Sequence, residues 1–168
     1  MLTQVHEILI AQHEICCSLI ILKENIMNGN INSDNKKLIE IYFHSVWNNG
    51  ELDLLDKIID EKYMNHSPGG TSHPPVPGPA GLKPIIVAMR QGFPDLHYAI
   101  KDIVITENRI VARVLMTGTF LGELWGMQPN GMKIEVDQIN IEYVKNGKIY
   151  EHWRLTDELT MMKQLRQI

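Results

Sequence analysis

The pattern of apolar and polar positions changes once along the chain, near Pro94, from a helical period to the alternation typical of strands. Before that point apolar residues recur three and four positions apart, which predicts helices that bury one face. Residues 69–79, rich in proline and glycine, predict a loop, either a lid or a mobile connection. The predicted helices span residues 35–49, 51–59 and 80–93, and residues 62–68 predict a short extended piece.

After this point, two β-rich runs surround a turn at Glu107 and Asn108, and two more surround Asn146 and Gly147. An Asn-Gly pair between alternating apolar residues is a strong signal of a hairpin. The runs cover residues 96–120 and 132–155, and residues 157–165 predict a closing helix. Helices that precede antiparallel strands predict an α+β fold in which the helices cover one face of a curved sheet.

The N-terminal residues form a separate segment in this pattern. Residues 2–27 carry apolar side chains near a helical period, and the turn-rich residues 28–35 follow as a linker. We therefore divide the chain into an extension, residues 1–34, and a domain, residues 35–168. The extension is either an extra helix packed on the domain or an arm that binds another chain. Charged residues interrupt its apolar run, so it predicts neither a membrane span nor a targeting segment.

Composition narrows the class of partner. The net charge is −4 and no basic patch is present, which argues against nucleic acid. The two cysteines, Cys16 and Cys17, are adjacent and cannot form a disulfide framework, so we expect a cytoplasmic protein. The seven histidines lack the spacing of a metal site, and the glycines lack the context of a phosphate-binding loop, so no metal is expected.

Polar side chains occur at regular positions in the last two predicted strands. Gln138 and Asn140 share one face of their strand, and His152 and Arg154 share one face of the next. Apolar residues occur on both faces, so both are expected to be covered, and covered polar groups need partners. Two interpretations stay open: these residues are satisfied by one another or by neighbouring groups, or they line a ligand pocket.

Four segments of the chain, in this order, resemble the SnoaL-like polyketide cyclases, also called ester cyclase-like proteins. They are NKKLIEIYFHSVWNNGELDLLDKIIDEKYMNHSPG, GPAGLKPIIVAMRQGFPDL, MTGTFLGELWGMQPNGMKI and VKNGKIYEHWRLTDELTMMKQL, which fall within about residues 35–165. The resemblance implies a nuclear transport factor two-like cone, in which a curved antiparallel sheet and helices on its concave face enclose an apolar pocket. It also implies a small apolar or aromatic ligand, no cofactor, and a homodimer formed through the sheet.

The resemblance further implies where the chemistry takes place. Cyclases of this family close a ring by an aldol step, with an acid/base aspartate at the position of Arg154 and a pocket histidine at that of Asn140. Arginine keeps its proton and cannot act as a base. The candidate catalytic residues are therefore His152 and Asp157, and Asp157 also fits the start of the closing helix as its cap. The candidate ligand-binding residues are Arg154, Gln138, Asn140, Asn65, His66 and Trp153.

These residues support two functions of different classes. The first is an enzyme that performs cofactor-free acid/base chemistry on a small apolar carbonyl compound, as a cyclase, lyase, isomerase or hydrolase. The second is a non-catalytic binding module in which Arg154 holds an acidic ligand through paired hydrogen bonds. A third interpretation, an interaction protein that uses its N-terminal helix, depends on residues 1–34.

Overall fold

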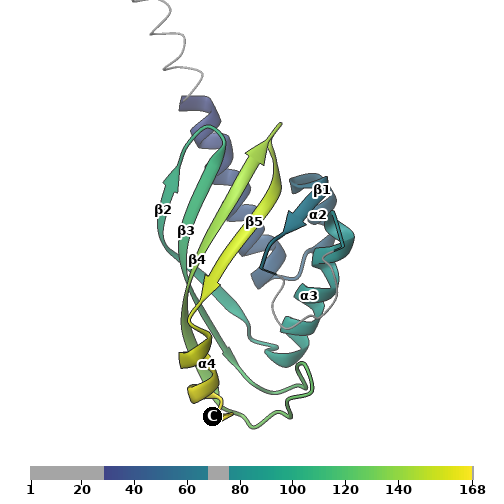
Figure 1. Ribbon diagram of the computed structural model, residues 1–168, viewed down its shortest axis with the longest axis vertical. Coiled ribbons are helices and arrows are strands. Elements are labelled where there is room, and N and C mark those ends of the chain that lie inside the picture. Colours follow the sequence, from purple (N-terminus) through teal and green to yellow (C-terminus); the bar gives the residue numbers. More distant parts are fainter. Residues whose placement is uncertain (1–28, 68–75, 168) are drawn as a thin grey trace, which may run out of the picture.

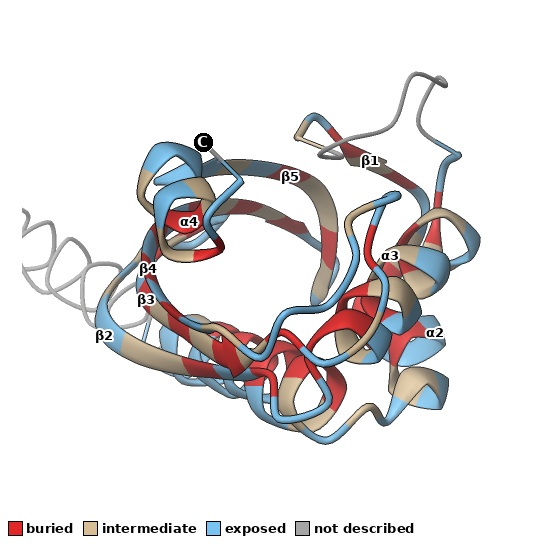
Figure 2. Cartoon of the chain, turned by 90° about the horizontal axis from the view of Figure 1, so that it is seen from below, coloured by how far each residue is buried: buried red, intermediate tan, exposed pale blue. Residues whose placement is uncertain are grey.

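The computed structural model describes residues 29–67 and 76–167. A curved, open sheet of five strands runs in the order β1-β5-β4-β3-β2, and helices pack along its concave side (Figure 1 and Figure 2). This arrangement confirms the predicted α+β fold.

The N-terminal part of the domain is helical over a longer stretch than the sequence predicts. Residues 29–40 are helical and run directly into η1 (Ile41–Asn48), where the helix adopts π-type hydrogen bonding. The predicted linker is therefore wrong for residues 29–35. The predicted helix at residues 2–27 lies outside the described part of the chain, and the division at residue 34 stays a prediction.

The remaining helices fall where the hydrophobic period places them. They are η2 (Leu52–Leu54), α2 (Leu55–Ile58), α3 (Pro79–Gly92) and α4 (Glu158–Gln164). Pro84 is the sixth residue of α3, and because proline has no backbone N–H, the hydrogen bond to the Ala80 carbonyl is missing there. Leu82, Ile86 and Met89 still form a buried face on this helix, and that burial holds it in place.

The sheet contains one pairing that the sequence does not predict. β1 (Ile59–Asn65) pairs in parallel with β5 (Lys148–Thr156), whereas β2 (His97–Ile105), β3 (Arg109–Thr119), β4 (Lys133–Lys145) and β5 form antiparallel neighbours. Parallel pairing is sterically available because β1 reaches β5 through a long crossover rather than a tight turn. The predicted hairpin between β4 and β5 is confirmed, with φ angles of 52° at Asn146 and 72° at Gly147.

The hydrophobic core lies on the concave side, between the sheet and the helices (Figure 2). η1 contributes Tyr42, Phe43, Val46 and Trp47, and β3 contributes every second residue from Ile110 to Met116. Within residues 29–67 and 76–167, no helix is long and apolar enough to cross a membrane.

Candidate functional site

The concave face of β4 and β5 carries three cross-strand pairs of polar residues. The register places Gln138 opposite Thr156, Asn140 opposite Arg154, and Glu142 opposite His152. Side chains two positions apart point to the same face of a strand, so all six share the concave face. Gln138, Asn140, Glu142 and His152 are each at most 3% exposed. Polar side chains on a covered face need partners, and the partners differ from one pair to the next.

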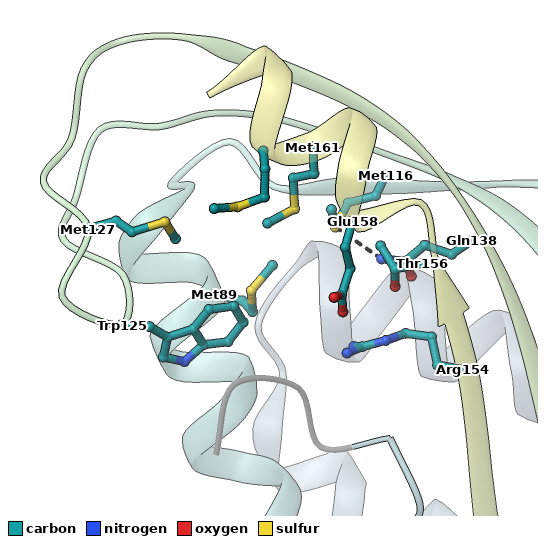
Figure 3. A pocket seen from close by; sticks show the side chains of 10 residues that line it. Met89, Met116, Trp125, Met127, Gln138, Arg154, Thr156, Glu158 and Met161 are labelled. Atoms are coloured by element: carbon teal, nitrogen blue, oxygen red, sulfur yellow. Dashed lines mark hydrogen bonds between the residues drawn. The ribbon is translucent and has the colours of Figure 1, made fainter. Parts of the chain in front are cut away.

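A largely apolar cavity of about 340 Å³ opens beside the end of this face that carries Gln138 and Thr156 (Figure 3). Five methionines supply most of its wall, from α3, β3, the loop after β3, and α4. Methionine side chains are flexible and polarizable, so this wall adapts to ligands of different outline. The lining consists of Met89, Met116, Trp125, Met127, Gln138, Arg154, Thr156, Glu158, Met161 and Met162.

Arg154 and Glu158 are the two charged residues of this lining. The Arg154 guanidinium donates a hydrogen bond to the Ser67 carbonyl at 3.3 Å, and no acidic side chain of the described residues lies within 4.0 Å of it. The Glu158 carboxylate is directed across the cavity toward the guanidinium (Figure 3). The cavity therefore presents one cation and one anion in a wall made mostly of methionines.

Gln138 lies between the cavity and the deeper polar pairs. Its Nε2 donates to the Met116 sulfur at 3.4 Å, which is a weak hydrogen bond. Tyr98 faces the same amide, and burial raises the pKa of Tyr98 to about 12. The Gln138 amide thus has donor capacity left for a ligand oxygen next to Arg154.

A second, much smaller space lies deeper in the cone. This recess has a volume of about 10 Å³ and shares Gln138 and Arg154 with the cavity. Such a volume holds about one water molecule. The recess is lined by Tyr42, Phe43, Trp47, Tyr98, Gln138, Asn140, His152 and Arg154.

His152 forms a buried pair with Glu142 at the inner end of the recess. The His152 Nδ1 and Glu142 Oε1 atoms are 2.8 Å apart, and the two side chains are 4% and 0% exposed. Burial raises the pKa of Tyr42 and Tyr63 above the ordinary value, and the Glu142 charge raises both further. The two hydroxyls therefore stay protonated at neutral pH beside this acid–base pair.

Asn65 belongs to the support of the site. It pairs with His152 in the parallel register, and its Oδ1 accepts a hydrogen bond from the Ser67 backbone at 2.9 Å. Ser67 in turn accepts from the Arg154 backbone through Oγ and from its guanidinium through the carbonyl. The Asn65 side chain thus orders the turn that holds Arg154, and it is absent from the lining of the cavity and the recess.

Three residues named from the sequence lie away from the cavity. Asp157 caps α4, where its carboxylate accepts from the Thr160 backbone at 3.0 Å. Trp153 is 46% exposed on the opposite face of β5, and the His66 ring stacks on it at 4.2 Å. The structure therefore brings together His152, Arg154, Gln138 and Asn140, and leaves Asp157, Trp153 and His66 outside this group.

Two acidic residues of the site were missed by sequence reasoning. Glu142 follows Asn140 by two positions, so the alternation that selected Gln138 and Asn140 also places it on the concave face. Glutamate is rarely buried, which is why the pattern was not extended to it. Glu158 adjoins Asp157, and the cap geometry turns the glutamate toward the cavity. In the described residues, no cluster of three or more His, Cys, Asp or Glu forms a metal site.

The chain is similar to proteins that act on methyl esters. Aklanonic acid methyl ester cyclase DnrD of Streptomyces peucetius is 26% identical over 133 residues, which cover 77% of this chain and 86% of that protein. Nogalonic acid methyl ester cyclase of Streptomyces nogalater is 25% identical over 123 residues, which cover 72% of this chain and 90% of that protein.

Solved structures share the fold. TsrD from Streptomyces laurentii superimposes with a TM-score of 0.73 at 24% identity, covering 81% of this chain and 97% of that one. IdmH from Streptomyces antibioticus gives a TM-score of 0.68 at 29% identity, covering 78% and 97%. The family model described as SnoaL-like polyketide cyclase matches residues 37–165, so the chain belongs to the SnoaL-like polyketide cyclase family.

Proposed function

We propose that the protein catalyses cofactor-free proton transfer on a small, neutral, apolar carbonyl compound bound in the methionine-lined cavity. The observation that carries the proposal is the opposed pair of Arg154 and Glu158 in a wall made mostly of methionines. A cation that binds a carbonyl oxygen and a carboxylate that removes a neighbouring proton are the two groups that enolate formation requires.

The oxygen of the carbonyl group binds at Arg154 and Gln138. Among the described residues, the Arg154 guanidinium donates one hydrogen bond, to the Ser67 carbonyl, and the Gln138 amide donates to the Met116 sulfur and faces the Tyr98 hydroxyl. Both side chains therefore have N–H groups to donate to a ligand oxygen. As the oxygen becomes negatively charged, hydrogen bonds from a fixed cation strengthen, which lowers the barrier to enolate formation.

The proton on the adjacent carbon goes to Glu158 in this proposal. Arg154 keeps its proton and cannot be the base. Glu158 is the carboxylate of the described lining, and it takes the place that sequence reasoning gave to Asp157. The C–H bond breaks, its electrons move into the carbonyl group, and the enolate carbon is then able to attack a second carbonyl or to be protonated again. His152, at the recess, is the second acid/base group.

The charges of the cavity favour a neutral ligand. Arg154 and Glu158 offset one another, so an added carboxylate gains attraction from the first and repulsion from the second. The names of the curated relatives refer to methyl ester cyclases, and an ester is such a neutral carbonyl group. We therefore propose ester-bearing β-dicarbonyl compounds as the substrate class of this chain. Ring closure follows where the ligand carries a second carbonyl group that the enolate carbon can attack.

Exchange of the α-protons of methyl benzoylacetate in deuterated water tests the proposal without knowledge of the product. Proton NMR follows the loss of the signal. The wild-type chain is expected to accelerate exchange, and Glu158→Gln and Arg154→Met are each expected to slow it on the order of 10²-fold. Glu61→Gln, at an exposed position on β1, is the matched control and should exchange at the wild-type rate. Equal rates in all four proteins contradict the proposal.

A second function is favoured by one observation. Because no described acidic side chain lies within 4.0 Å of Arg154, a non-catalytic module that holds an acidic ligand there is the alternative. A ligand that binds only the folded state raises the melting temperature. Stabilisation by phenylacetate, lost in Arg154→Met, with no stabilisation by methyl benzoylacetate supports the binding module over the enzyme.

A further inference from the structure

The narrow end of the cone holds more unsatisfied polar atoms than a structural core requires. Among the described residues, Tyr63 Oη, Asn140 Nδ2 and Glu142 Oε2 are buried and have no hydrogen-bond partner. Each of these residues is at most 2% exposed, and Glu142 is fully buried. A buried polar atom without a partner costs stability, and a buried carboxylate costs more. An apolar or amide pair at the Glu142–His152 position would therefore be more stable.

The contact of Glu142 with His152 determines which ring nitrogen faces the recess. Glu142 Oε1 lies 2.8 Å from Nδ1, so Nε2 is the nitrogen left for a group in the recess, which His152 lines. A carboxylate on one ring nitrogen fixes the orientation of the imidazole and stabilises its protonated form. The pair therefore has the arrangement of a base with its positioning residue.

The recess offers its occupant both a donor and an acceptor. Asn140 Nδ2 is an unpartnered donor whose residue is 2% exposed and which lines the recess together with His152. The volume of about 10 Å³ accommodates one oxygen atom. Because Arg154 and Gln138 line both spaces, an oxygen in the recess lies next to the carbonyl site of the cavity.

We propose that the recess is a second oxygen subsite, which takes the hydroxyl of an enol or alcohol on the ligand, and that Glu142 positions His152 to accept its proton. The inference rests on the proposed function and deepens it, because it selects ligands with two neighbouring oxygens, such as β-dicarbonyl compounds in their enol form. The O–H bond breaks, the oxygen keeps the electron pair, and the proton moves to His152 Nε2. The Glu142 carboxylate balances the imidazolium, and the proton returns to the ligand when the product forms.

The groups around the pair support this assignment. Tyr42 on η1, Tyr63 on β1 and Tyr98 on β2 are buried tyrosines that remain neutral donors, and Arg154 on β5 is the cation on the cavity side. An enolate oxygen in the recess therefore faces Asn140 and Arg154 as donors. Glu142 itself is absent from the lining of the recess.

The test compares two aromatic ketones that differ in one feature. Benzoylacetone has an enol hydroxyl and absorbs at longer wavelength as the enolate, while benzylacetone has a single carbonyl group. Both are expected to raise the melting temperature of the wild-type chain. At a pH where free benzoylacetone is neutral, only the bound diketone is expected to show the enolate band. The His152→Gln and Glu142→Met chains are expected to bind benzoylacetone, but the intensity of the enolate band should fall about tenfold or more.

Further variants separate positioning from charge and from folding. Glu142→Gln keeps an acceptor for Nδ1 and should retain more of the band than Glu142→Met. Nitrogen-15 NMR of the imidazole checks the ring directly: its neutral form should carry the proton on Nδ1 in the wild-type and Glu142→Gln chains, and shift toward Nε2 in Glu142→Met. Glu61→Gln, at an exposed position on β1, is the control and should keep the full band.

The outcomes distinguish the two proposals. Failure of both ketones to stabilise the wild-type chain overturns the proposed function, and the recess assignment with it. Binding that depends on Arg154, with an unchanged enolate band in His152→Gln and Glu142→Met, overturns the recess assignment alone. An unchanged ring tautomer in Glu142→Met removes the positioning role of Glu142.

Discussion

The two faces of the β4–β5 hairpin differ from the usual pattern, in which apolar side chains are buried and polar side chains are exposed. The concave face carries Gln138, Asn140, Glu142, His152, Arg154 and Thr156, although this face is the covered one. On the convex face, Ile139 opposes Leu155 and Ile141 opposes Trp153. Leu155 is 74% exposed, whereas Glu142 is 0% exposed.

Each reversal costs stability in an isolated chain, and each has a different explanation. Buried polar groups lose water, and exposed apolar groups order it. For the concave face we propose a chemical role as the explanation, because its polar side chains line a cavity and a recess. For the convex face we propose a second copy of the chain as the cover, in line with the homodimer through the sheet that the sequence resemblance implies.

The largest expected effect is on the concave face. Glu142→Ala leaves the buried His152 ring without its hydrogen-bond partner at 2.8 Å, and an unsatisfied buried polar group costs about 1–3 kcal/mol of unfolding free energy. His66→Ala is the control on the other face, because His66 and Glu151 form a partly exposed pair worth about 0–1 kcal/mol. Urea unfolding measures both, and similar losses for the two variants remove the distinction between the faces.

The next effect concerns the convex face. If this face is covered by a second copy, replacing both Ile139 and Leu155 with lysine should raise the dimer dissociation constant on the order of 10²-fold, since each side chain contributes about 1.5–3 kcal/mol when buried. Leu121→Lys, at a similarly exposed position outside the hairpin, should leave the dimer intact. Sedimentation velocity reads the oligomeric state. A wild-type chain that sediments as a monomer contradicts the proposed cover of the convex face by a second copy.

A smaller effect appears in alkaline solution. Burial raises the pKa of Tyr98 to about 12 from 10.0, and raises those of Tyr42 and Tyr63 as well. The stability that these groups contribute is present below pH 10 and is lost as the pH rises through the folded-state values. Urea midpoints should therefore fall steeply above pH 10, and less steeply in Tyr98→Phe. Parallel pH curves for the two proteins contradict the burial of this hydroxyl.

The smallest expected effect on stability concerns Asp157, which follows β5 and caps α4. The hydrogen bonds from Thr160 lower the pKa of Asp157 below 3.8, so its capping contribution is present above that value and is lost as the pH falls through the folded-state pKa. Asp157→Ala should lower the melting temperature slightly at neutral pH, and the difference should vanish in acid. A pH-independent difference would show that the charge is irrelevant to the cap.

The sequence predicts the elements of this fold better than the function of single residues. Alternation was enough to place Gln138 with Asn140 on one face of β4, and His152 with Arg154 on one face of β5, because side-chain period is a local property. It left open whether that face lines a pocket. The sequence did not predict Glu142 as a site residue, because its burial depends on a partner ten residues away across the hairpin. The sequence did not predict Glu158 either, because the direction of a side chain in the first turn of a helix depends on the cap geometry and not on the hydrophobic period. The parallel pairing of β1 depends on packing that no local pattern encodes.

The concave polar pairs all lie within residues 138–156, on one hairpin closed by one turn. The register of that hairpin sets their mutual positions, and the Ser67 turn holds Arg154 from outside it. A lineage is thus able to inherit the methionine wall and the helices unchanged while it acquires another hairpin, and with it another chemistry. The same modularity gives the protein engineer a single contiguous cassette in which to exchange an arginine for an aspartate at residue 154 and ask which activity returns.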